Sequence, residues 1–585
     1  MNEYRTHYCD EITTKDVGKK VRIAGFVETI RDLGGLVFLD IRDMYGVTQV
    51  VTSAESKDID IISHIPVQSV VTVYGTVRER SEDTINLKLK TGKVEIYIEE
   101  IKILGKRTKA LPFEINGDTQ VREDLRLKYR YLDLRSEKIR EKLKLRAKII
   151  QFLREQMIEK DFLEVQTPIL TASSPEGARD YLVPSRLHKG KFYALPQAPQ
   201  QFKQLLMVAG IDKYFQIAPC FRDEDARADR VPGEFYQLDM EMAFSTQDDV
   251  FAIMEPIMYE TFKKFSDKEV SKYPFKRITY NEAMAKYGSD KPDLRNPLEI
   301  VDVTDLFEHI DLKAFAGQKV RIIATHEVKE QPRSFFEGMT EYAVKKLKAK
   351  GLAWLRIMDD LSLQGPIAKF IPEAAKIEML KRTQSKAGDC IFFIAEYPKI
   401  VDKLAGAVRE ELGRRLGLIN EKKVEFCWIT DFPMYEYDEK GKLTFCHNPF
   451  SMPQGGLKAL ESEKPLSIVA YQYDLVCNGV ELASGAVRNH DPEIMIKAFE
   501  KVGYDKEYIE EKFNAMFSAF QFGAPPHAGI APGIDRMIML LTGSESIREV
   551  IAFPLSGKAE DLMMGAPGIV SDEQLRELHL KISEL

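Results

Sequence analysis

A row of polar side chains marks residues 213–244, which read KYFQIAPCFRDEDARADRVPGEFYQLDMEMAF. At the two-residue period of a β-strand, one face of the second half carries Phe235, Gln237, Asp239 and Glu241. The opposite face runs from Tyr236 to Phe244 in steps of two; it is apolar and typical of a core. Two carboxylates, an amide and a ring are an unusual set for a solvent-facing surface, so a binding site is one interpretation.

The strand before this row ends in Arg222 and Glu224, which share a face. The loop that follows, RDEDARADR, is almost entirely charged. Charges at a strand end commonly form only a solvated turn. This stretch alone therefore leaves the solvated turn and the ligand site as open alternatives.

A second pair of carboxylates lies in YQYDLVCNGVELASGAVR. Asn478-Gly479 between two apolar runs predicts a tight β-hairpin, which makes Asp474 and Glu481 diagonal neighbours on one face. Such carboxylates repel each other unless they share a cation. Mg²⁺, bound also by phosphates, is the cation we expect there. Arg488 lies seven residues beyond Glu481.

A glycine-rich strand near the C-terminus, GAPPHAGIAPGIDRMIMLLTG, leads into a helix that begins around Asp535 and Arg536. Gly529 and Gly533 predict close approach of the backbone to a ligand. A helix N-terminus beside an arginine favours phosphate.

Two weaker signals lie upstream of the polar row. The loop TASSPEGARDYLVPSR carries Glu176 and predicts either a surface loop or a lid over a ligand. The helix predicted in QAPQQFKQLLMVAG places Gln200 and Lys203 on one face. Neither signal identifies a site by itself.

The elements that must position these residues fall into several domains, as the chain of 585 residues requires. About five β-rich segments between 15 and 105 predict a small barrel, with the OB-fold as first choice. On it, Phe38 between Arg31 and Gln49 suits base stacking and readout, although a lone strand Phe is usually core. Residues 106–135 are a charged connector, and about 277–423 have the texture of an inserted domain without a catalytic cluster.

Bulk composition narrows the possible classes. The net charge of −7 excludes nucleic-acid binding by overall charge, so any such partner needs a local basic surface. Six scattered cysteines without a CxxC pair argue against zinc fingers and disulfides, and for a reducing compartment. No signal core or long apolar run is present, so we expect a cytoplasmic protein without membrane contact.

Together these pieces resemble a class II aminoacyl-tRNA synthetase, and most closely the bacterial type of aspartyl-tRNA synthetase. The family's three motifs match FLEVQTPILT, FRDEDARADRVPGEFYQLDMEM and GIAPGIDRM. Its aspartate-type signatures match SPEGARDYLVPSR, QAPQQFKQLLM, YGSDKPDLR and WITDFPMYEYDE. No P-loop and no class I signature is present.

The resemblance implies an α+β multidomain fold. It consists of an anticodon-binding OB-fold over 1–108, a hinge over 109–138, and a catalytic domain over 139–283 and 423–585, interrupted by a GAD-like insert over 284–422. The catalytic domain is expected to be a six-stranded antiparallel sheet flanked by helices. The implied enzyme is a homodimeric aspartate–tRNA ligase that uses ATP and Mg²⁺ to join L-aspartate to tRNA(Asp).

The resemblance also implies residue roles. Catalysis falls to Arg222 and Arg536. ATP is bound by Arg222, Asp223, Glu224, Phe235, Glu481, Gly533, Ile534, Asp535 and Arg536, with Phe235 and Arg536 enclosing the adenine. Aspartate is bound by Glu176, Gln200, Lys203, Arg222, Asp239, His447 and Arg488. Mg²⁺ is held by Asp474 and Glu481, and the anticodon by Arg31, Phe38 and Gln49. Selectivity for aspartate is expected from a buried cationic pocket that a neutral amide would leave unpaired.

The chain departs from the family pattern at several positions. Asn448 follows His447 where two histidines are common, Val231 and Gly233 differ in the second motif, and only Arg31 remains of an arginine-rich run. Leu33 stands where members that also charge tRNA for asparagine tend to carry His, which favours strict aspartate specificity. A ligase for both tRNA(Asp) and tRNA(Asn) stays the alternative. An asparagine or lysine enzyme, a related asparagine synthetase and a non-catalytic RNA-binding paralogue are less consistent with the acidic-substrate residues and the intact site.

Overall fold

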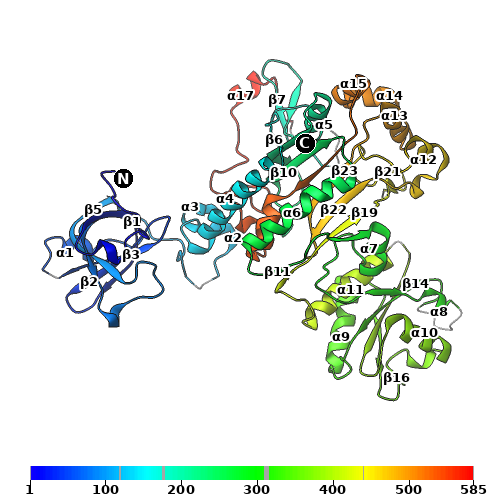
Figure 1. Cartoon of the computed structure of the whole chain (residues 1–585), viewed down its shortest axis with the longest axis horizontal. Helices are drawn as coiled ribbons and strands as arrows, with labels where there is room; N and C mark the ends of the chain where they lie inside the picture. Colours follow the sequence, from blue (N-terminus) through cyan, green and yellow to red (C-terminus); the bar gives the residue numbers. More distant parts are fainter. Residues whose placement is uncertain are drawn as a thin grey trace. The chain divides into compact units, whose positions relative to one another are not determined.

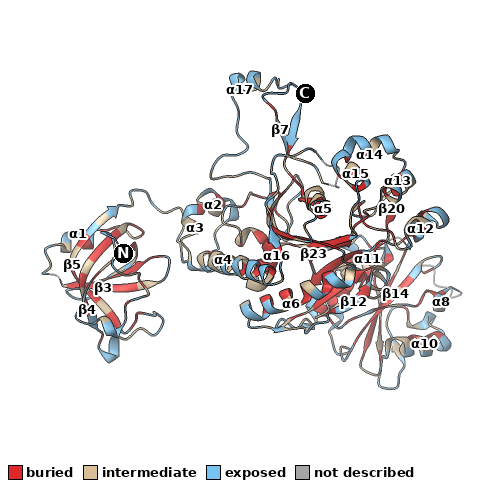
Figure 2. Ribbon diagram, turned by 45° about the horizontal axis from the view of Figure 1, so that its top comes forward, coloured by how far each residue is buried: buried red, intermediate tan, exposed pale blue. Residues whose placement is uncertain are grey.

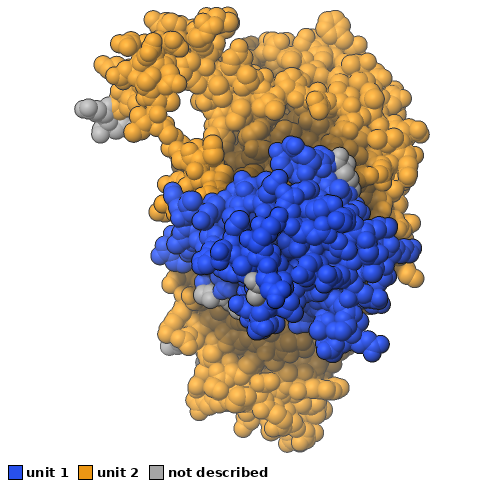
Figure 3. Space-filling view, turned by 90° about the vertical axis from the view of Figure 1, so that its left-hand side faces the viewer, with its two compact units in different colours: residues 1–125 blue, residues 126–585 orange. Residues whose placement is uncertain are grey.

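The computed structural model describes residues 2–53, 55–117, 120–173, 178–308, 315–398, 400–438 and 440–583. The chain divides into two compact units, one ending at Leu125 and the other beginning at Arg126 (Figure 3). This division falls inside the segment that the sequence predicts as a hinge. No helix in these ranges is both long enough and apolar enough to cross a membrane.

The first unit is a closed five-stranded barrel with the strand order β1-β2-β3-β5-β4. Its strands are β1 (Lys20–Asp32), β2 (Leu36–Arg42), β3 (Val47–Ser53), β4 (Val70–Glu79) and β5 (Val94–Gly105). Every pairing is antiparallel except that of β3 with β5. Alternate residues such as Val37, Leu39 and Ile41 fill the barrel, as a period of two requires. The predicted OB-fold is therefore confirmed.

An eight-stranded sheet forms the centre of the second unit, in the order β12-β19-β22-β23-β24-β10-β9-β6 (Figure 1). Its strands are β6 (Leu163–Glu164), β9 (Lys213–Arg222), β10 (Gly233–Ala243), β12 (Lys276–Thr279), β19 (Phe426–Thr430), β22 (Gln472–Cys477), β23 (Val480–Val487) and β24 (His527–Pro532). The central strands from β19 to β9 pair antiparallel, and a short parallel strand is added at each edge. The expected antiparallel sheet is thus present and extended at both ends.

One face of this sheet is covered by α4 (Glu137–Ile158), α6 (Gln247–Phe265) and α16 (Ile534–Thr542). The apolar row of β10, including Leu238, Met240 and Met242, packs into that core, where buried residues concentrate (Figure 2). The sequence assigned Phe244 to the same row, but β10 ends at Ala243 and Phe244 is 73% exposed with a positive φ. The polar row of β10 consequently faces the other side, toward α5 (Gln200–Val208).

The inserted domain leaves the sheet after β12 and returns at β19, its neighbour. It has its own sheet, in the order β13-β14-β17-β15-β16, with strands at Ile300–Asp302, Lys319–Thr325, Cys390–Glu396, Ala353–Ile357 and Leu363–Gln364. Separate apolar clusters involve α11 (Val401–Arg415) and α10 (Glu373–Thr383). The predicted α+β insert is confirmed.

Candidate active site

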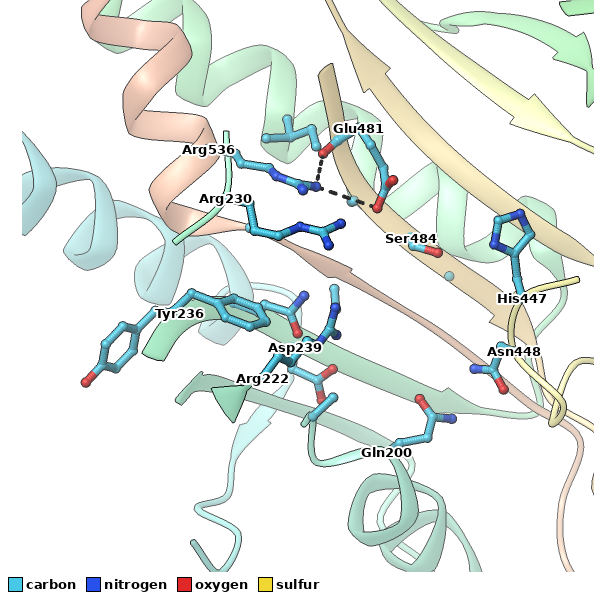
Figure 4. A pocket seen from close by; sticks show the side chains of 18 of the residues that line it. Gln200, Arg222, Arg230, Tyr236, Asp239, His447, Asn448, Glu481, Ser484 and Arg536 are labelled. Atoms are coloured by element: carbon cyan, nitrogen blue, oxygen red, sulfur yellow. Dashed lines mark hydrogen bonds and ion pairs between the residues drawn. The ribbon is translucent and has the colours of Figure 1, made fainter. Parts of the chain in front are cut away.

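A cavity of about 500 Å³ opens on the polar face of the large sheet (Figure 4). It is bordered by α5, β9, β10, β23, the start of α16 and the loop around His447. Residues separated by hundreds of positions therefore meet there. The predicted site residues that line it are Gln200, Lys203, Arg222, Glu224, Phe235, Asp239, His447, Glu481, Arg488, Gly533, Asp535 and Arg536.

Four predicted site residues are placed otherwise. Glu176 lies outside the described residues. Asp223, Ile534 and Asp474 are not among the described lining residues. Ile534 is fully buried in the core, and Asp223 pairs with Arg179 at 3.7 Å instead.

Four buried ionisable side chains form a cluster at the cavity, and three of them line it: Lys203, Asp239 and Arg488. Lys203 Nζ lies 2.7 Å from Asp239 Oδ1 and 3.2 Å from Glu241 Oε2. Arg488 donates to Glu241 through Nε at 2.8 Å and Nη2 at 3.2 Å. Although burial opposes it, the Arg488 guanidinium lowers the pKa of Glu241 to about 2. The bidentate geometry is one that Lys could not reproduce.

This cluster corrects the sequence argument. A cationic pocket was expected, but two basic and two acidic side chains pair with one another there. Glu241, visible in the polar row yet given no role, is the carboxylate that contacts both cations. Lys203 and Arg488 each have N–H groups beyond those used in these contacts, since an ammonium has three N–H groups and a guanidinium has five.

Two buried polar atoms at the same end of the cavity have no hydrogen-bond partner within the described structure. They are Asp239 Oδ2 and Gln200 Nε2, from facing elements (Figure 4). Burial is the main reason that the pKa of Asp239 is raised, against the opposing effect of Lys203. Buried orphan groups are costly, so their presence indicates a ligand with both a donor and an acceptor.

The cavity also carries an aromatic ring and two guanidinium groups. Arg222 lies 5.0 Å from the centroid of the Phe235 ring, and no carboxylate of the described residues forms an ion pair with it. Arg536 donates to the Glu481 carbonyl at 2.7 Å and to the Asp229 carbonyl at 3.2 Å. This geometry suits a ligand with a planar group between the Phe235 ring and the Arg536 guanidinium, and with an anionic group on the Arg222 guanidinium.

The loop between β9 and β10 is also anchored. Glu224, predicted to bind adenine, pairs with Arg230 at 2.7 Å. Gly233 pairs with Arg222 in register and has a φ of +87°, and a Cβ there would come 2.8 Å from Leu555. The departure at Gly233 is therefore structural: the hairpin needs a residue without a side chain at this point.

Asp535 secures the first turn of α16. It accepts a hydrogen bond from the Tyr236 backbone N–H at 3.0 Å and pairs with Arg146 of α4. These contacts fix the helix N-terminus against β10, beside Arg536. A helix terminus held in this way favours a phosphate group nearby.

The two predicted metal ligands lie on neighbouring strands. A bulge shifts the pairing, so that Glu481 is opposite Val476 and Asp474 is opposite Ser484. Asp474 is buried, its Oδ1 has no partner in the described structure, and burial with the nearby Glu481 raises its pKa. An orphan carboxylate oxygen beside a second carboxylate fits Mg²⁺ held jointly with phosphates. The described residues offer no cluster of three or more acidic, His or Cys ligands.

His447 and Asn448 lie on the loop at the rim. His447 is exposed at the rim, yet desolvation of its ring by the surrounding residues lowers its pKa, so the ring is neutral at pH 7. The ring packs edge-on against Phe432. Asn448 Oδ1 accepts the Phe450 backbone N–H at 2.8 Å. Asn448 therefore stabilises the turn that presents His447.

The barrel has a polar patch of its own. Arg31 is paired across the strands with Phe38, and its Nη2 contacts Asp40 at 3.1 Å and Gln49 at 3.2 Å. The three residues predicted to read a nucleic acid thus share one face. Gln49 also donates to Glu95 at 2.8 Å, a residue that sequence reasoning did not single out.

Comparison with known proteins identifies the family. The family model described as tRNA synthetases class II (D, K and N) matches residues 122–557, and one described as OB-fold nucleic acid binding domain matches 21–104. The chain belongs to the class II tRNA synthetases.

Relatives of this synthetase extend over its full length. The aspartate–tRNA ligase of Streptomyces coelicolor is 55% identical over 583 residues, covering 100% of this chain and 99% of the relative. The aspartate–tRNA(Asp/Asn) ligase of Rickettsia bellii is 55% identical over 595 residues, covering 100% and 98%.

Solved structures support the synthetase fold. The asparaginyl-tRNA synthetase of Pyrococcus horikoshii gives a TM-score of 0.58 at 18% identity, covering 94% of this chain and 97% of that one. The aspartyl-tRNA synthetase of Entamoeba histolytica gives 0.58 at 20% identity, covering 93% and 90%. At these identities the likeness concerns the fold alone.

Proposed function

We propose that this synthetase is an aspartate–tRNA ligase. It activates L-aspartate with ATP to aspartyl-adenylate and pyrophosphate, then transfers aspartate to the terminal adenosine of tRNA(Asp). The observation that carries the proposal is the buried Lys203–Asp239–Glu241–Arg488 cluster beside a ring-and-guanidinium site. A small ligand with an ammonium and an extra carboxylate matches that cluster. Relatives 55% identical over the full length are named aspartate–tRNA ligase and aspartate–tRNA(Asp/Asn) ligase.

Aspartate is placed by charge. Its ammonium satisfies the orphan Asp239 Oδ2, and Gln200 Nε2 donates to one of its oxygens. Its side-chain carboxylate takes the free donors of Lys203 and Arg488, with neutral His447 at the rim. An asparagine amide supplies no charge to those donors, which costs several kcal/mol when the groups are buried.

The reaction needs no side-chain nucleophile. The α-carboxylate of aspartate attacks the α-phosphorus of ATP in line and pyrophosphate leaves, so catalysis consists of positioning and charge neutralisation. Arg222 holds the attacking carboxylate and the α-phosphate, while Phe235 and Arg536 hold the adenine. Glu481 and Asp474 would hold Mg²⁺, which would supply positive charge near the leaving pyrophosphate.

The tRNA anticodon is assigned to the barrel face with Arg31, Phe38 and Gln49. Unpaired bases can stack on Phe38 and form hydrogen bonds through their edges with Arg31 and Gln49. Some relatives are named as aspartate–tRNA ligases and others as aspartate–tRNA(Asp/Asn) ligases, so their names do not decide which tRNAs this chain charges. Our choice of tRNA(Asp) alone rests on Leu33, which is 65% exposed at the β1–β2 turn. We expect charging of tRNA(Asp) and little charging of tRNA(Asn), measured with purified tRNAs.

The chain is also proposed to act as a cytoplasmic homodimer. The described cysteines are not joined in disulfides, which suits a reducing compartment. The edge strand β6 and the segment after it expose Leu163, Ile169 and Leu170, each about half accessible. Such a row at a sheet edge favours pairing with a second copy. Light scattering should give about twice 66.9 kDa; a monomeric mass contradicts this assignment.

Aspartate-dependent exchange of pyrophosphate into ATP tests the proposed activity. Exchange is expected with aspartate and is expected to be weaker by several orders of magnitude with asparagine or lysine. The tRNA can be omitted, which separates activation from transfer. No exchange with aspartate would refute the proposal.

A further inference from the structure

The segment 288–299 connects α7 (Tyr280–Tyr287) of the catalytic region with the first strand of the inserted domain. Lys291 in this segment contacts Glu481, one of the two carboxylates predicted to bind Mg²⁺. Lys291 Nζ lies 3.3 Å from Glu481 Oε2 and 2.9 Å from Asp290 Oδ2, and all three side chains are about one-third exposed or less. The predicted Mg²⁺ ligand Glu481 is therefore already paired with a cation supplied from outside the sheet.

The charges around this contact explain why a cation is needed. Glu481 and the buried Asp474 repel each other, and the orphan Oδ1 of Asp474 has no donor of its own among the described residues. Arg536 Nη1 approaches Glu481 on the other oxygen, at 3.6 Å. Lys291 and Arg536 are thus two cations that balance the carboxylate pair, and Lys291 is the one that contacts Glu481 Oε2.

The inserted domain holds this segment in place. Arg409 of α11, 1% exposed, donates to the backbone carbonyls of Asp293 at 3.0 Å, Asn296 at 2.7 Å and Leu298 at 2.5 Å. Asn296 Nδ2 returns a hydrogen bond to the Arg409 carbonyl at 3.0 Å. Fully satisfied buried contacts of this kind fix a backbone.

We propose that Lys291 is a positioning residue that serves as the counter-ion of the Glu481–Asp474 pair. A divalent cation must displace the Lys291 ammonium in order to bind these carboxylates. The inserted domain holds Lys291 in this position through Arg409. This gives the insert a role at the active site, although its own residues carry no catalytic cluster. The inference rests on the metal site of the proposed function, but not on which amino acid or tRNA is used.

Binding of Mn²⁺ to the nucleotide-free full-length protein, followed by electron paramagnetic resonance, tests the proposal. Lys291→Met is expected to bind Mn²⁺ at least about tenfold more tightly, since it removes a competing unit charge a few ångströms from the carboxylates. Lys291→Arg keeps the charge and is expected to stay within about threefold of wild type. Adding Glu481→Gln to Lys291→Met should abolish the gain. Equal affinity of Lys291→Met and wild type would overturn the proposal.

The coupling to the insert needs its own variants. Arg409→Met, or Asn296→Ala if the first does not fold, is expected to shift Mn²⁺ affinity in the same direction as Lys291→Met. The matched control is Arg333→Met, whose side chain is 83% exposed on α9 (Arg333–Glu341) and should leave affinity unchanged. Wild-type affinity in folded Asn296→Ala and Arg409→Met would remove the insert from the proposal. Absence of pyrophosphate exchange, by contrast, would concern only the proposed activity.

Discussion

At the scale of single residues, the pairing of four buried ionisable side chains decides what a substitution does. Arg488→Leu removes a predicted aspartate ligand and also leaves Glu241 with Lys203 alone. Breaking a buried pair by removing one partner costs about 3 kcal/mol or more. We therefore expect this variant to lose aspartate-dependent exchange and about 3 kcal/mol of unfolding free energy, measured by urea denaturation.

The double variant Glu241→Gln, Arg488→Leu separates the two losses. Neutralising the stranded carboxylate should return much of the stability, while exchange stays absent because the guanidinium donors are still missing. Full stability of the single variant, or activity of the double one, would contradict the assigned pairing.

A second expectation at this scale concerns pH. Burial raises the pKa of Asp239, and the ionised carboxylate is the form that accepts the substrate ammonium. Aspartate affinity should therefore be complete above this pKa and decline as the pH falls through it, at a higher pH than an unshifted aspartate carboxyl would give. Calorimetric titration of aspartate against pH measures this. Asp239→Asn should bind aspartate weakly, and its affinity should not decline in this way at low pH. An unchanged decline in Asp239→Asn would assign the titration to another group.

At the scale of elements, the glycines of β24 and α16 have different tasks. Both were predicted to admit a ligand. A Cβ at Gly529 would instead lie 2.0 Å from Glu241 Oε2 and 2.3 Å from the Met240 carbonyl, whereas at Gly533 the nearest atom is 3.7 Å away. Gly529 is thus required by packing within the sheet, and Gly533 lines the cavity.

Alanine at each position distinguishes these tasks. Gly529→Ala is expected to lose about 3 kcal/mol of stability because the strand or Glu241 must move. Gly533→Ala should remain within about 0.5 kcal/mol of wild type, since φ −74° suits any residue, and should raise the KM for ATP several-fold. Chemical denaturation and exchange kinetics give both values. Equal stability of the two variants would refute the distinction.

At the scale of the whole molecule, the barrel and the catalytic unit are separate compact units with separate cores. Activation should therefore be independent of the barrel, and only transfer to tRNA should need it. Phe38→Ala is expected to lower charging of tRNA(Asp) by roughly 10- to 100-fold, the value of one stacked base, while exchange stays unchanged. Loss of exchange in a folded Phe38→Ala protein would argue against this separation.

The sequence by itself determined the local features of this protein. A period of two predicted the polar row of β10, the alternation of apolar residues predicted the barrel, and Asn478-Gly479 predicted the β22–β23 hairpin. The order of the motifs predicted the synthetase family. Those motifs also contained most of the predicted residues that line the cavity. These signals are visible because each depends on neighbours along one chain segment.

Only the tertiary structure decided how charges pair across segments. Glu241 and Arg488 are 247 positions apart, and Lys291 reaches Glu481 from a segment that continues into another domain. No spacing encodes such contacts, because strand register, a bulge and the packing of the insert set them. The same holds for burial: Coulomb energy depends on distance and solvent exclusion, so a pocket that reads as cationic from its residue types is electrically balanced once folded.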